Sequence, residues 1–179
     1  QIIMTRITLE HIPEHTLPAG YRFRLFHGGD RHTWLRIHDI AETHVDVTGE
    51  TFDTSFDNDL PALRRRMLFL VAPDGQNVGT ATAWHEPKYR YRSWGRLHWV
   101  AIVPEHRGKG LAKPLVIEAM KLMRSIGHRR AMLTTQPVRI PAIKVYLNLG
   151  FTPDMTTADA EANWASVREQ LDHPEFRSG

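Results

Sequence analysis

The segment that most constrains the fold is residues 98–112, which read HWVAIVPEHRGKGLA. Its first half is an apolar run that ends at a proline, as expected of a buried strand, and a short basic loop with two glycines follows. Apolar residues then recur with helical spacing, at Leu111, Ala112, Leu115, Val116, Ala119, Leu122, Met123 and Ile126. Gly127 is a natural stop beyond them. The segment therefore predicts a strand, a glycine loop and the first turn of a helix.

A strand that leads through glycines into a helix is a favourable place for an anion. It presents successive backbone N–H groups at the positive end of a helix dipole, which suits a pyrophosphate, and glycine keeps side chains from holding the ligand away. Two phosphate-binding motifs are excluded. No Ser or Thr follows the Gly-Lys pair to bind magnesium, and the spacing of G-x-G-x-x-G is absent. A tight turn without a ligand stays open as the alternative.

The loop resembles that of the GNAT-type N-acetyltransferases, whose pyrophosphate loop follows the pattern R/Q-x-x-G-x-G/A. Residues 107–112, RGKGLA, fit it at every required position. Downstream, residues 142–151, AIKVYLNLGF, are similar to the family's A-I-x-x-Y-x-x-x-G-F helix and turn. With two matches in the correct order, the chain is identified as a member of this family. The resemblance covers residues 78–151 in detail; the part before them agrees only in its pattern of elements.

The resemblance implies the GNAT acyl-CoA N-acyltransferase fold, an α/β (α+β) architecture. In this fold helices flank a central, twisted, mixed but mostly antiparallel sheet that is splayed between its fourth and fifth strands. Hydrophobic periodicity and turn signals predict strands at residues 21–26, 67–72, 78–84, 96–103 and 131–135 and from 151. They predict helices at 60–66, from 111, from 141 and at 159–171, and one that Asp30 could cap, with an apolar face at Trp34, Ile37, Ile40 and Ala41. Residues 1–20 are expected to form an irregular N-terminal extension, and residues 21–179 a single domain.

Composition narrows the chemistry. The chain has no cysteine, which excludes disulfides, thiolate metal sites and a cysteine nucleophile. Its eleven histidines show no metal-ligand spacing, because Pro13 separates His11 from His15, so we expect no metal. Without an apolar run of membrane-spanning length or a signal peptide, we expect a cytoplasmic protein with no membrane partner. A net charge of +3 fits a ligand with several phosphates better than nucleic acid, and a homodimer is left open.

The resemblance implies that acetyl-CoA is the acyl donor. The loop would hold the pyrophosphate mainly through its main chain, with charge added by its basic side chains; its site residues are Arg107, Gly108, Lys109, Gly110, Leu111, Ala112 and Lys113. The pantetheine arm would pair with the backbone of Val100, Ala101 and Ile102, and the Val100 amide would contact the thioester carbonyl. A solvated basic surface and an ordinary core strand are the structural alternatives.

The catalytic candidates are Tyr146 and His98. Tyr146 matches the family tyrosine that protonates the leaving thiolate, and an ordinary tyrosine with a pKa of about 10 is protonated at neutral pH. Where some members have a strand glutamate as base, this chain has Arg96, which cannot serve. His98 lies two residues on, on the same strand face, as in the similar arylalkylamine acetyltransferases. A hydrogen-bonded sheet histidine is the alternative for His98, and His85 or Glu86 are the alternative bases.

The acceptor side is less defined. Residues 37–63 contain no lysine or arginine but seven carboxylates: Asp39, Glu42, Asp46, Glu50, Asp53, Asp57 and Asp59. A negative lid would favour a cationic amine, with Glu42 and Asp46 as candidate substrate contacts beside His85 and Glu86. A solvated acidic surface is the alternative. Arg139 stands where the family often has an asparagine that contacts the coenzyme.

These observations predict an acetyl-CoA-dependent N-acetyltransferase that acts on a primary amine of a small molecule or peptide, by direct attack in a ternary complex. A catalytically silent acyl-CoA-binding sensor on the same fold is one alternative. A nucleic-acid-binding module is a weaker one. It would use the loop at residues 87–96, in which basic and aromatic residues are interleaved: Lys88, Tyr89, Arg90, Tyr91, Arg92, Trp94 and Arg96.

Overall fold

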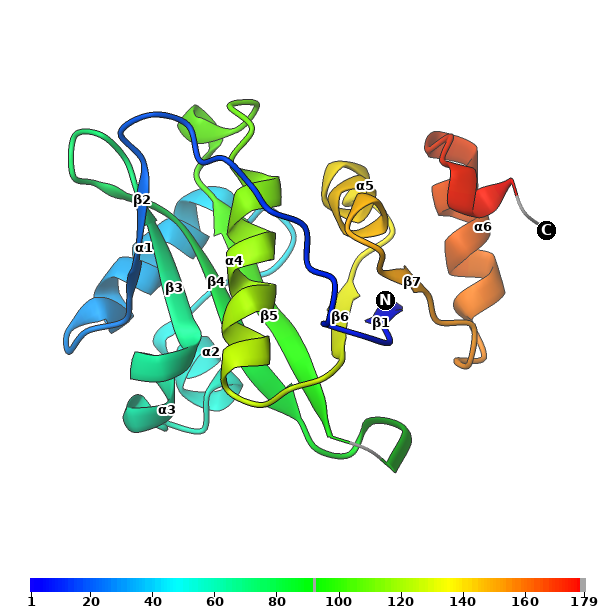
Figure 1. Cartoon of the computed structure of the whole chain (residues 1–179), viewed down its shortest axis with the longest axis horizontal. Coiled ribbons are helices and arrows are strands. Elements are labelled where there is room, and N and C mark those ends of the chain that lie inside the picture. Colours follow the sequence, from blue (N-terminus) through cyan, green and yellow to red (C-terminus); the bar gives the residue numbers. More distant parts are fainter. Residues whose placement is uncertain (92, 178–179) are drawn as a thin grey trace.

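The protein is built around a seven-stranded sheet flanked by helices (Figure 1). The structure is a computed structural model that describes residues 1–91 and 93–177. The elements follow in the order β1 (Ile2–Arg6), β2 (Arg22–Leu25), α1 (Asp30–Ala41), α2 (Gly49–Ser55), α3 (Leu60–Arg66), β3 (Met67–Val71), β4 (Asn77–Glu86), η1 (Tyr89–Tyr91), β5 (Trp94–Ile102), η2 (Pro104–His106), α4 (Ala112–Ser125), β6 (Ala131–Thr135), α5 (Ile140–Asn148), β7 (Thr152–Pro153), α6 (Ala160–Gln170) and η3 (Pro174–Phe176).

The strands are arranged in the order β2-β3-β4-β5-β6-β1-β7. Every neighbouring pair is antiparallel except β5 and β6, which run parallel and pair only at Gly95 with Ala131 and Arg96 with Met132. Beyond Arg96 the two strands separate. This confirms the expected mixed, mostly antiparallel sheet that is splayed between the expected fourth and fifth strands, which become β5 and β6 once β1 is counted.

The expectation that residues 1–20 are irregular is wrong at their start. Strand β1 lies between β6 and β7 and pairs with both, in a register that places Ile2 opposite Thr135 and Met4 opposite Leu133 and Pro153. Ile2 and Met4 are fully buried. The short apolar run is a strand because it fills a slot in the sheet, and its partners lie more than a hundred residues away. Residues 7–20 have no helix or strand, as expected.

The other expected elements agree closely with the structure. The predicted strand at residues 131–135 and the predicted helix at 60–66 match β6 and α3. Helix α2 was not predicted. It is only seven residues long, and it begins with a capping box in which Thr48 and Thr51 bond each other's backbone N–H groups. Asp59, one of the seven carboxylates of residues 37–63, caps α3 by accepting a hydrogen bond from the Ala62 amide.

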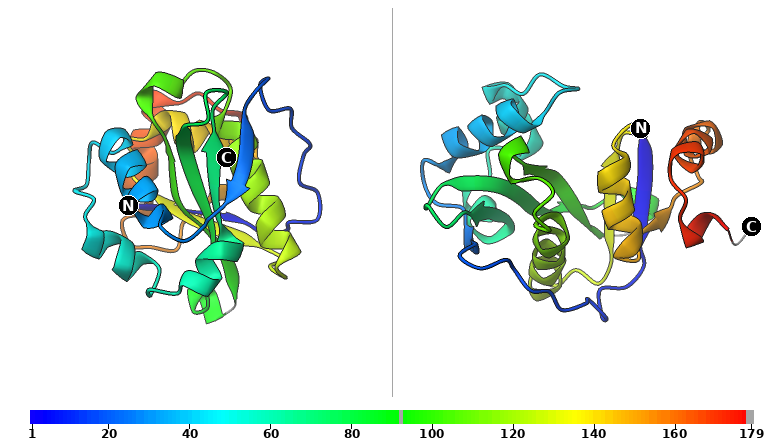
Figure 2. Two further views of the ribbon diagram at one scale, coloured as in Figure 1. Left: turned by 90° about the vertical axis from the view of Figure 1, so that its left-hand side faces the viewer. Right: turned by 90° about the horizontal axis from the view of Figure 1, so that it is seen from above.

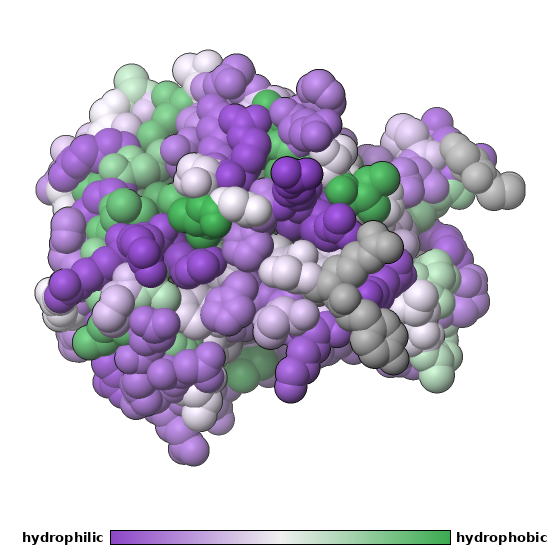
Figure 3. Space-filling model, turned by 60° about the horizontal axis from the view of Figure 1, so that its bottom comes forward, coloured by the Kyte–Doolittle hydropathy of each residue, from purple (hydrophilic) through white to green (hydrophobic). Residues whose placement is uncertain are grey.

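Helices cover both faces of the middle strands, so the hydrophobic core lies on both sides of the sheet. Helix α1 packs on one face of β4 and β5 and α4 packs on the other (Figures 1 and 2). Strand β4 is therefore buried along most of its length. The face seen in Figure 3 is mainly hydrophilic, with apolar residues in separate small patches. In the part of the chain that the structure describes, no helix is both long enough and apolar enough to cross a membrane.

The burial of β1 gives the first testable prediction. Met4→Ala should lower the free energy of unfolding by about 2–4 kcal/mol, because it leaves a cavity beneath the sheet. Ile7→Ala, at a side chain that is 80% exposed, should change it by less than about 0.5 kcal/mol. Urea unfolding of both variants measures the difference. Equal effects would show that β1 is not part of the cooperative sheet.

Candidate active site

A cleft of about 220 Å³ opens where β5 and β6 separate. It is lined by residues of α1, β5, β6 and α5 and of the segments next to them, among them Glu42, Arg96, His98, Thr134, Arg139 and Tyr146. The two predicted catalytic residues, His98 and Tyr146, therefore lie in one cleft although they are far apart in sequence.

A β-bulge lies in β5 at the edge of this cleft. Thr80 pairs with Ala101 and Thr82 with His98, so Trp99 and Val100 together oppose the single residue Ala81. Trp99 has φ of 49°, a left-handed conformation that is costly for a bulky side chain. Its indole N–H donates to Ser55 Oγ at 2.8 Å, and its ring packs on Trp34 at 5.2 Å. These contacts hold the bulge beside the cleft.

The backbone of β5 beyond Arg96 has a free edge. Strand β4 occupies one side of residues 97–102, whereas no strand of the described chain pairs with the other side. Val100 lines the cleft, and Ala101 and Ile102 follow it. The Ile102 carbonyl accepts a hydrogen bond from Arg107 Nε at 2.9 Å. A linear ligand with amide groups can add to such an edge as a further strand would.

The glycine loop forms the predicted connection from β5 to α4. Gly108 and Gly110 both have φ of 74°, and a side chain on either would point into open space. Helix α4 begins without a side-chain cap. The amides of residues 110–113 donate no hydrogen bond to any other residue that the structure describes. The loop therefore offers free N–H groups and room for an anion at a helix N-terminus.

The basic side chains of the loop divide into two kinds. Arg107 reaches away from the loop and donates to the carbonyls of Ile102 and Ala41, at 2.9 and 2.7 Å. It joins the loop to the end of α1. Lys109 and Lys113 are exposed, and neither has an ion pair within the described residues. Lys109 and Lys113 also make no hydrogen bond with a described residue, so their ammonium donors are free for a ligand, whereas Arg107 already uses Nε and Nη2.

Tyr146 lies on α5 with its side chain at the cleft. It is 7% exposed, and its hydroxyl has no hydrogen-bond partner among the described residues. Burial raises the pKa of Tyr146 to about 12, although the nearby positive charge of Arg139 acts against the shift. The phenol is therefore protonated throughout the physiological range and can donate a proton into the cleft.

Two histidines beside each other in the cleft are uncharged at neutral pH. Burial lowers the pKa of His98 to about 3, with further contributions from Arg96 and His38. Burial also lowers the pKa of His38 to about 3, against the attraction of Glu42. His38 packs on Trp34 with ring centroids 4.2 Å apart, and its Nε2 has no partner among the described residues. No motif in the sequence pointed to His38, which stands in an ordinary helix.

An ion pair links the two sides of the cleft. Arg139, just before α5, donates from one nitrogen to both carboxylate oxygens of Glu42, at 2.9 and 2.8 Å. The Glu42 side chain is 7% exposed. Burial favours its neutral form, but hydrogen bonds from the His44 amide and Arg139 prevail, so the pKa of Glu42 is lowered. Glu42 is thus ionised and already neutralised by Arg139.

The other acceptor candidates lie outside the cleft. Asp46 is exposed in the segment after α1. His85 and Glu86 lie at the end of β4, and neither lines the cleft. Of the seven carboxylates in residues 37–63, only Glu42 lines it. Asp53 pairs with Arg31 at 2.8 Å. The structure thus brings Glu42 to the predicted catalytic pair, but not Asp46, His85 or Glu86.

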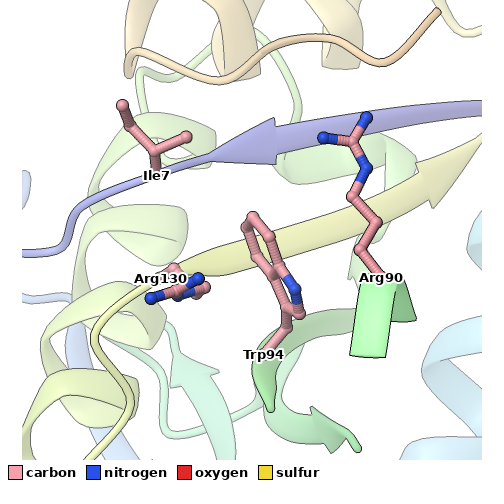
Figure 4. A pocket seen from close by; sticks show the side chains of 4 residues that line it. All are labelled: Ile7, Arg90, Trp94 and Arg130. Atoms are coloured by element: carbon pink, nitrogen blue, oxygen red, sulfur yellow. The ribbon is translucent and has the colours of Figure 1, made fainter. Parts of the chain in front are cut away.

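A second, more open pocket of about 460 Å³ lies at the other end of β5 and is lined by Ile7, Arg90, Trp94 and Arg130 (Figure 4). Trp94 is 4% exposed and lies edge-on against Tyr89, with Arg130 over its ring at 5.3 Å. Arg90 pairs with the buried Asp154 at 2.7 Å. Tyr89 and Trp94 of this loop, considered above for nucleic acid, thus offer little free aromatic surface; the Tyr91 side chain and Arg92 lie outside what the structure describes.

The family model described as the acetyltransferase (GNAT) family matches residues 34–151 of the chain. A mycothiol acetyltransferase of Pseudarthrobacter chlorophenolicus is 30% identical over 154 residues, which are 79% of this chain and 45% of that protein. A mycothiol acetyltransferase of Thermomonospora curvata is 30% identical over 144 residues, 79% of this chain and 47% of that one. The chain spans about half the length of these curated relatives.

Solved structures share the fold. A GCN5-related N-acetyltransferase from Sphaerobacter thermophilus superposes with a TM-score of 0.69 at 23% identity, covering 86% of this chain and 48% of that one. The glucosamine-6-phosphate N-acetyltransferase of Arabidopsis thaliana gives a TM-score of 0.57 at 18% identity, covering 76% of this chain and 95% of that one. At these identities the likeness establishes the fold alone.

The buried His38 makes stability depend on pH. Its folded pKa of about 3 lies below the ordinary value of 6.5. The unfolded chain therefore binds more protons between these values, and stability falls as pH is lowered through this window. Between pH 7 and pH 5, His38→Gln should reduce this loss by roughly 1–2 kcal/mol. Urea unfolding at both pH values measures it.

The matched control for this prediction is His32→Gln, at an exposed residue of the same helix. It should leave the pH dependence as in the wild type. An identical pH dependence in the His38 variant and the wild type would contradict the uncharged, buried state of His38.

Proposed function

The chain belongs to the acetyltransferase (GNAT) family, and we propose that it transfers an acetyl group from acetyl-CoA to a primary amine of a small molecule or peptide, by direct attack in a ternary complex. The observation that carries this proposal is the glycine loop at the head of α4, which has free amides and open space, beside the cleft that contains Tyr146. The three parts of the site fit one donor: a phosphate loop, a free strand edge and a proton donor.

The loop would hold the pyrophosphate of the coenzyme. The amides of residues 110–113 would donate to it, and Lys109 and Lys113 would add charge from the exposed side of the loop. Arg107 has a different role in this proposal: it keeps the loop attached to the end of α1 through the Ala41 carbonyl. The pantetheine arm would then lie along the free edge of Val100, Ala101 and Ile102.

Acetyl-CoA supplies the acetyl group as a thioester, and the protein's residues do the rest. The Val100 amide, beside the bulge, would donate to the thioester carbonyl. Tyr146 would give its proton to the departing sulfur. A phenol with a pKa of about 12 is a weak acid, but a thiolate in the same dry cleft is penalised by burial as well.

We assign His98 as the residue that orients the amine. A neutral imidazole accepts a hydrogen bond from the nucleophile, but with a pKa of about 3 it holds a transferred proton weakly. The amine would therefore lose its ammonium proton to bulk water before it enters the cleft. The second proton, which nitrogen loses as it forms the amide, would also leave to water, and the Tyr146 phenolate would regain a proton from water. Neither His85 nor Glu86 lines the cleft, which makes them poor alternatives as bases.

The catalytically silent acyl-CoA-binding sensor is the second candidate. The observation in its favour is the absence of a strong base from the described residues that line the cleft, because His98 and His38 both have a pKa of about 3 and Glu42 is paired with Arg139. The retained Tyr146 favours the enzyme.

Replacing Tyr146 separates these two candidates. Tyr146→Phe should lower kcat by roughly 100-fold or more, because a positioned general acid is lost. Affinity for acetyl-CoA and the fold should be preserved, since the hydroxyl has no partner to leave unsatisfied among the described residues. Thiol release and calorimetric binding of acetyl-CoA measure the two effects. Tyr89→Phe is the matched control, because its buried hydroxyl is also unpartnered but lies outside the cleft. Unchanged turnover in Tyr146→Phe would end its assignment as the acid.

The pH profile tests the role of His98. If the amine loses its proton to water, the ascending limb of kcat/KM should follow the pKa of each amine tested and should persist in His98→Gln at a lower rate. Amines of different basicity, assayed between pH 6 and pH 10, provide the measurement. An ascending limb near pH 6.5 that is the same for all amines and vanishes in His98→Gln would instead identify His98 as the base.

A further inference from the structure

Arg96 stands at the closed end of the cleft, at the last residue pair that joins β5 to β6. It lines the cleft, and its side chain is 28% exposed. A guanidinium has five N–H donors. Here it makes one long hydrogen bond, from Nη2 to Thr134 Oγ1 at 3.4 Å, and Nε is buried without a partner among the described residues. The donors of Arg96 are therefore mostly unused.

The charge of Arg96 is also poorly compensated. The carboxylate near it, Glu86, comes no closer than 3.6 Å, beyond a good hydrogen bond. By contrast, Arg139 in the same cleft contacts both oxygens of Glu42 within 2.9 Å. Burial lowers the pKa of Arg96, which reports the cost of holding this cation away from water, and Glu86 offsets only part of it.

The rest of the cleft adds no negative charge to balance Arg96. Glu42 is the one carboxylate among the described residues that line the cleft, and Arg139 neutralises it. His38 and His98 are uncharged near neutral pH. Among the lining side chains, Arg139 is thus balanced by Glu42, whereas Arg96 has only Glu86, outside the cleft and 3.6 Å away, and the Thr134 hydroxyl beside it. An anion brought by a ligand would satisfy both the charge and the unused donors.

We propose that Arg96 binds an anionic group, a carboxylate or a phosphate, on the amine that is acetylated. The inference rests on the proposed acetyl transfer and identifies the class of acceptor: an amine that carries a negative charge at some distance from its nitrogen. Arg96 and Val100 are four residues apart on β5, on the order of 10 Å along the strand. Several bonds must therefore separate the anion from the reacting amine. This replaces the cationic amine that the acidic segment 37–63 suggested.

The test compares amines that differ only in the anionic group. γ-Aminobutyrate is paired with n-butylamine, and aminopropyl phosphate with aminopropanol, so that the two arms distinguish a carboxylate from a phosphate. The wild type should show a kcat/KM about 10- to 100-fold higher for the anionic member of at least one pair, as expected for a charge-assisted contact in a dry site. The preferred arm identifies the anion.

Variants of Arg96 attribute the preference to this side chain. In Arg96→Gln the ratio within the preferred pair should fall to near one, whereas Arg96→Lys, which keeps the charge, should retain part of it. Arg130→Gln is the matched control, because Arg130 lines the other pocket, and it should keep the wild-type ratio. A ratio that survives in Arg96→Gln would overturn the proposal.

Calorimetric binding of the same amines without acyl donor separates this inference from the proposed function. Tighter binding of the anionic member to the wild type, lost in Arg96→Gln, supports the anion site even if no amine is turned over. If neutral and anionic amines are acetylated equally well, the anion site is refuted and the proposed function stands. If acetyl-CoA does not bind and no amine binds selectively, both are refuted.

Discussion

Strands β5 and β6 run parallel and are joined at only two residue pairs, Gly95 with Ala131 and Arg96 with Met132. Each strand then leads into a different part of the site, because the glycine loop and α4 follow β5, and α5 with Tyr146 follows β6. Had the two strands stayed paired, the edge of Val100 and Ala101 would be filled by β6, and no space would separate the loop from Tyr146. The early separation of one strand pair is what creates a cleft that Tyr146 lines, beside the glycine loop that we propose as the phosphate-binding loop.

Helix α1 holds these two walls in place. At its C-terminal end the Ala41 carbonyl accepts from Arg107 of the glycine loop, and the next residue, Glu42, is paired with Arg139 at the start of α5. The same helix supplies Trp34, which packs against Trp99 and helps to keep the bulge in β5. Contacts from α1 and the residue after it thus reach the proposed donor loop, the bulge beside the proposed oxyanion contact and the helix that carries the proposed acid. A single helix therefore fixes the relative positions of the three parts, although the sheet between them is divided.

Burial determines the electrostatics of the cleft more than pairing does. It keeps Tyr146 protonated and His38 and His98 neutral, and it lowers the pKa of Arg96, whose ion pair with Glu86 is long, at 3.6 Å. A cleft whose cation, Arg96, is incompletely compensated favours a ligand that brings a negative charge. The same dryness would strengthen the contact of the Val100 amide with a developing oxyanion, because fewer water dipoles compete with it.

The sequence by itself determined the local elements and singled out the residues of the proposed donor site. Helical periodicity after Gly110 and the apolar runs predicted α4, β3 and β6, and motifs placed Tyr146 and the glycine loop, because these signals lie within one turn, one strand or one loop. Only the tertiary structure showed β1, whose partners lie more than a hundred residues away, and α2, whose segment GETFDTS has a single apolar residue, Phe52, and so no apolar periodicity. Only the tertiary structure showed the Glu42–Arg139 pair, the low pKa of His98 and the weakly paired Arg96, with its buried Nε lacking a partner among the described residues. Burial and charge pairing depend on which distant residues meet, and neither can be found in the local order of the chain.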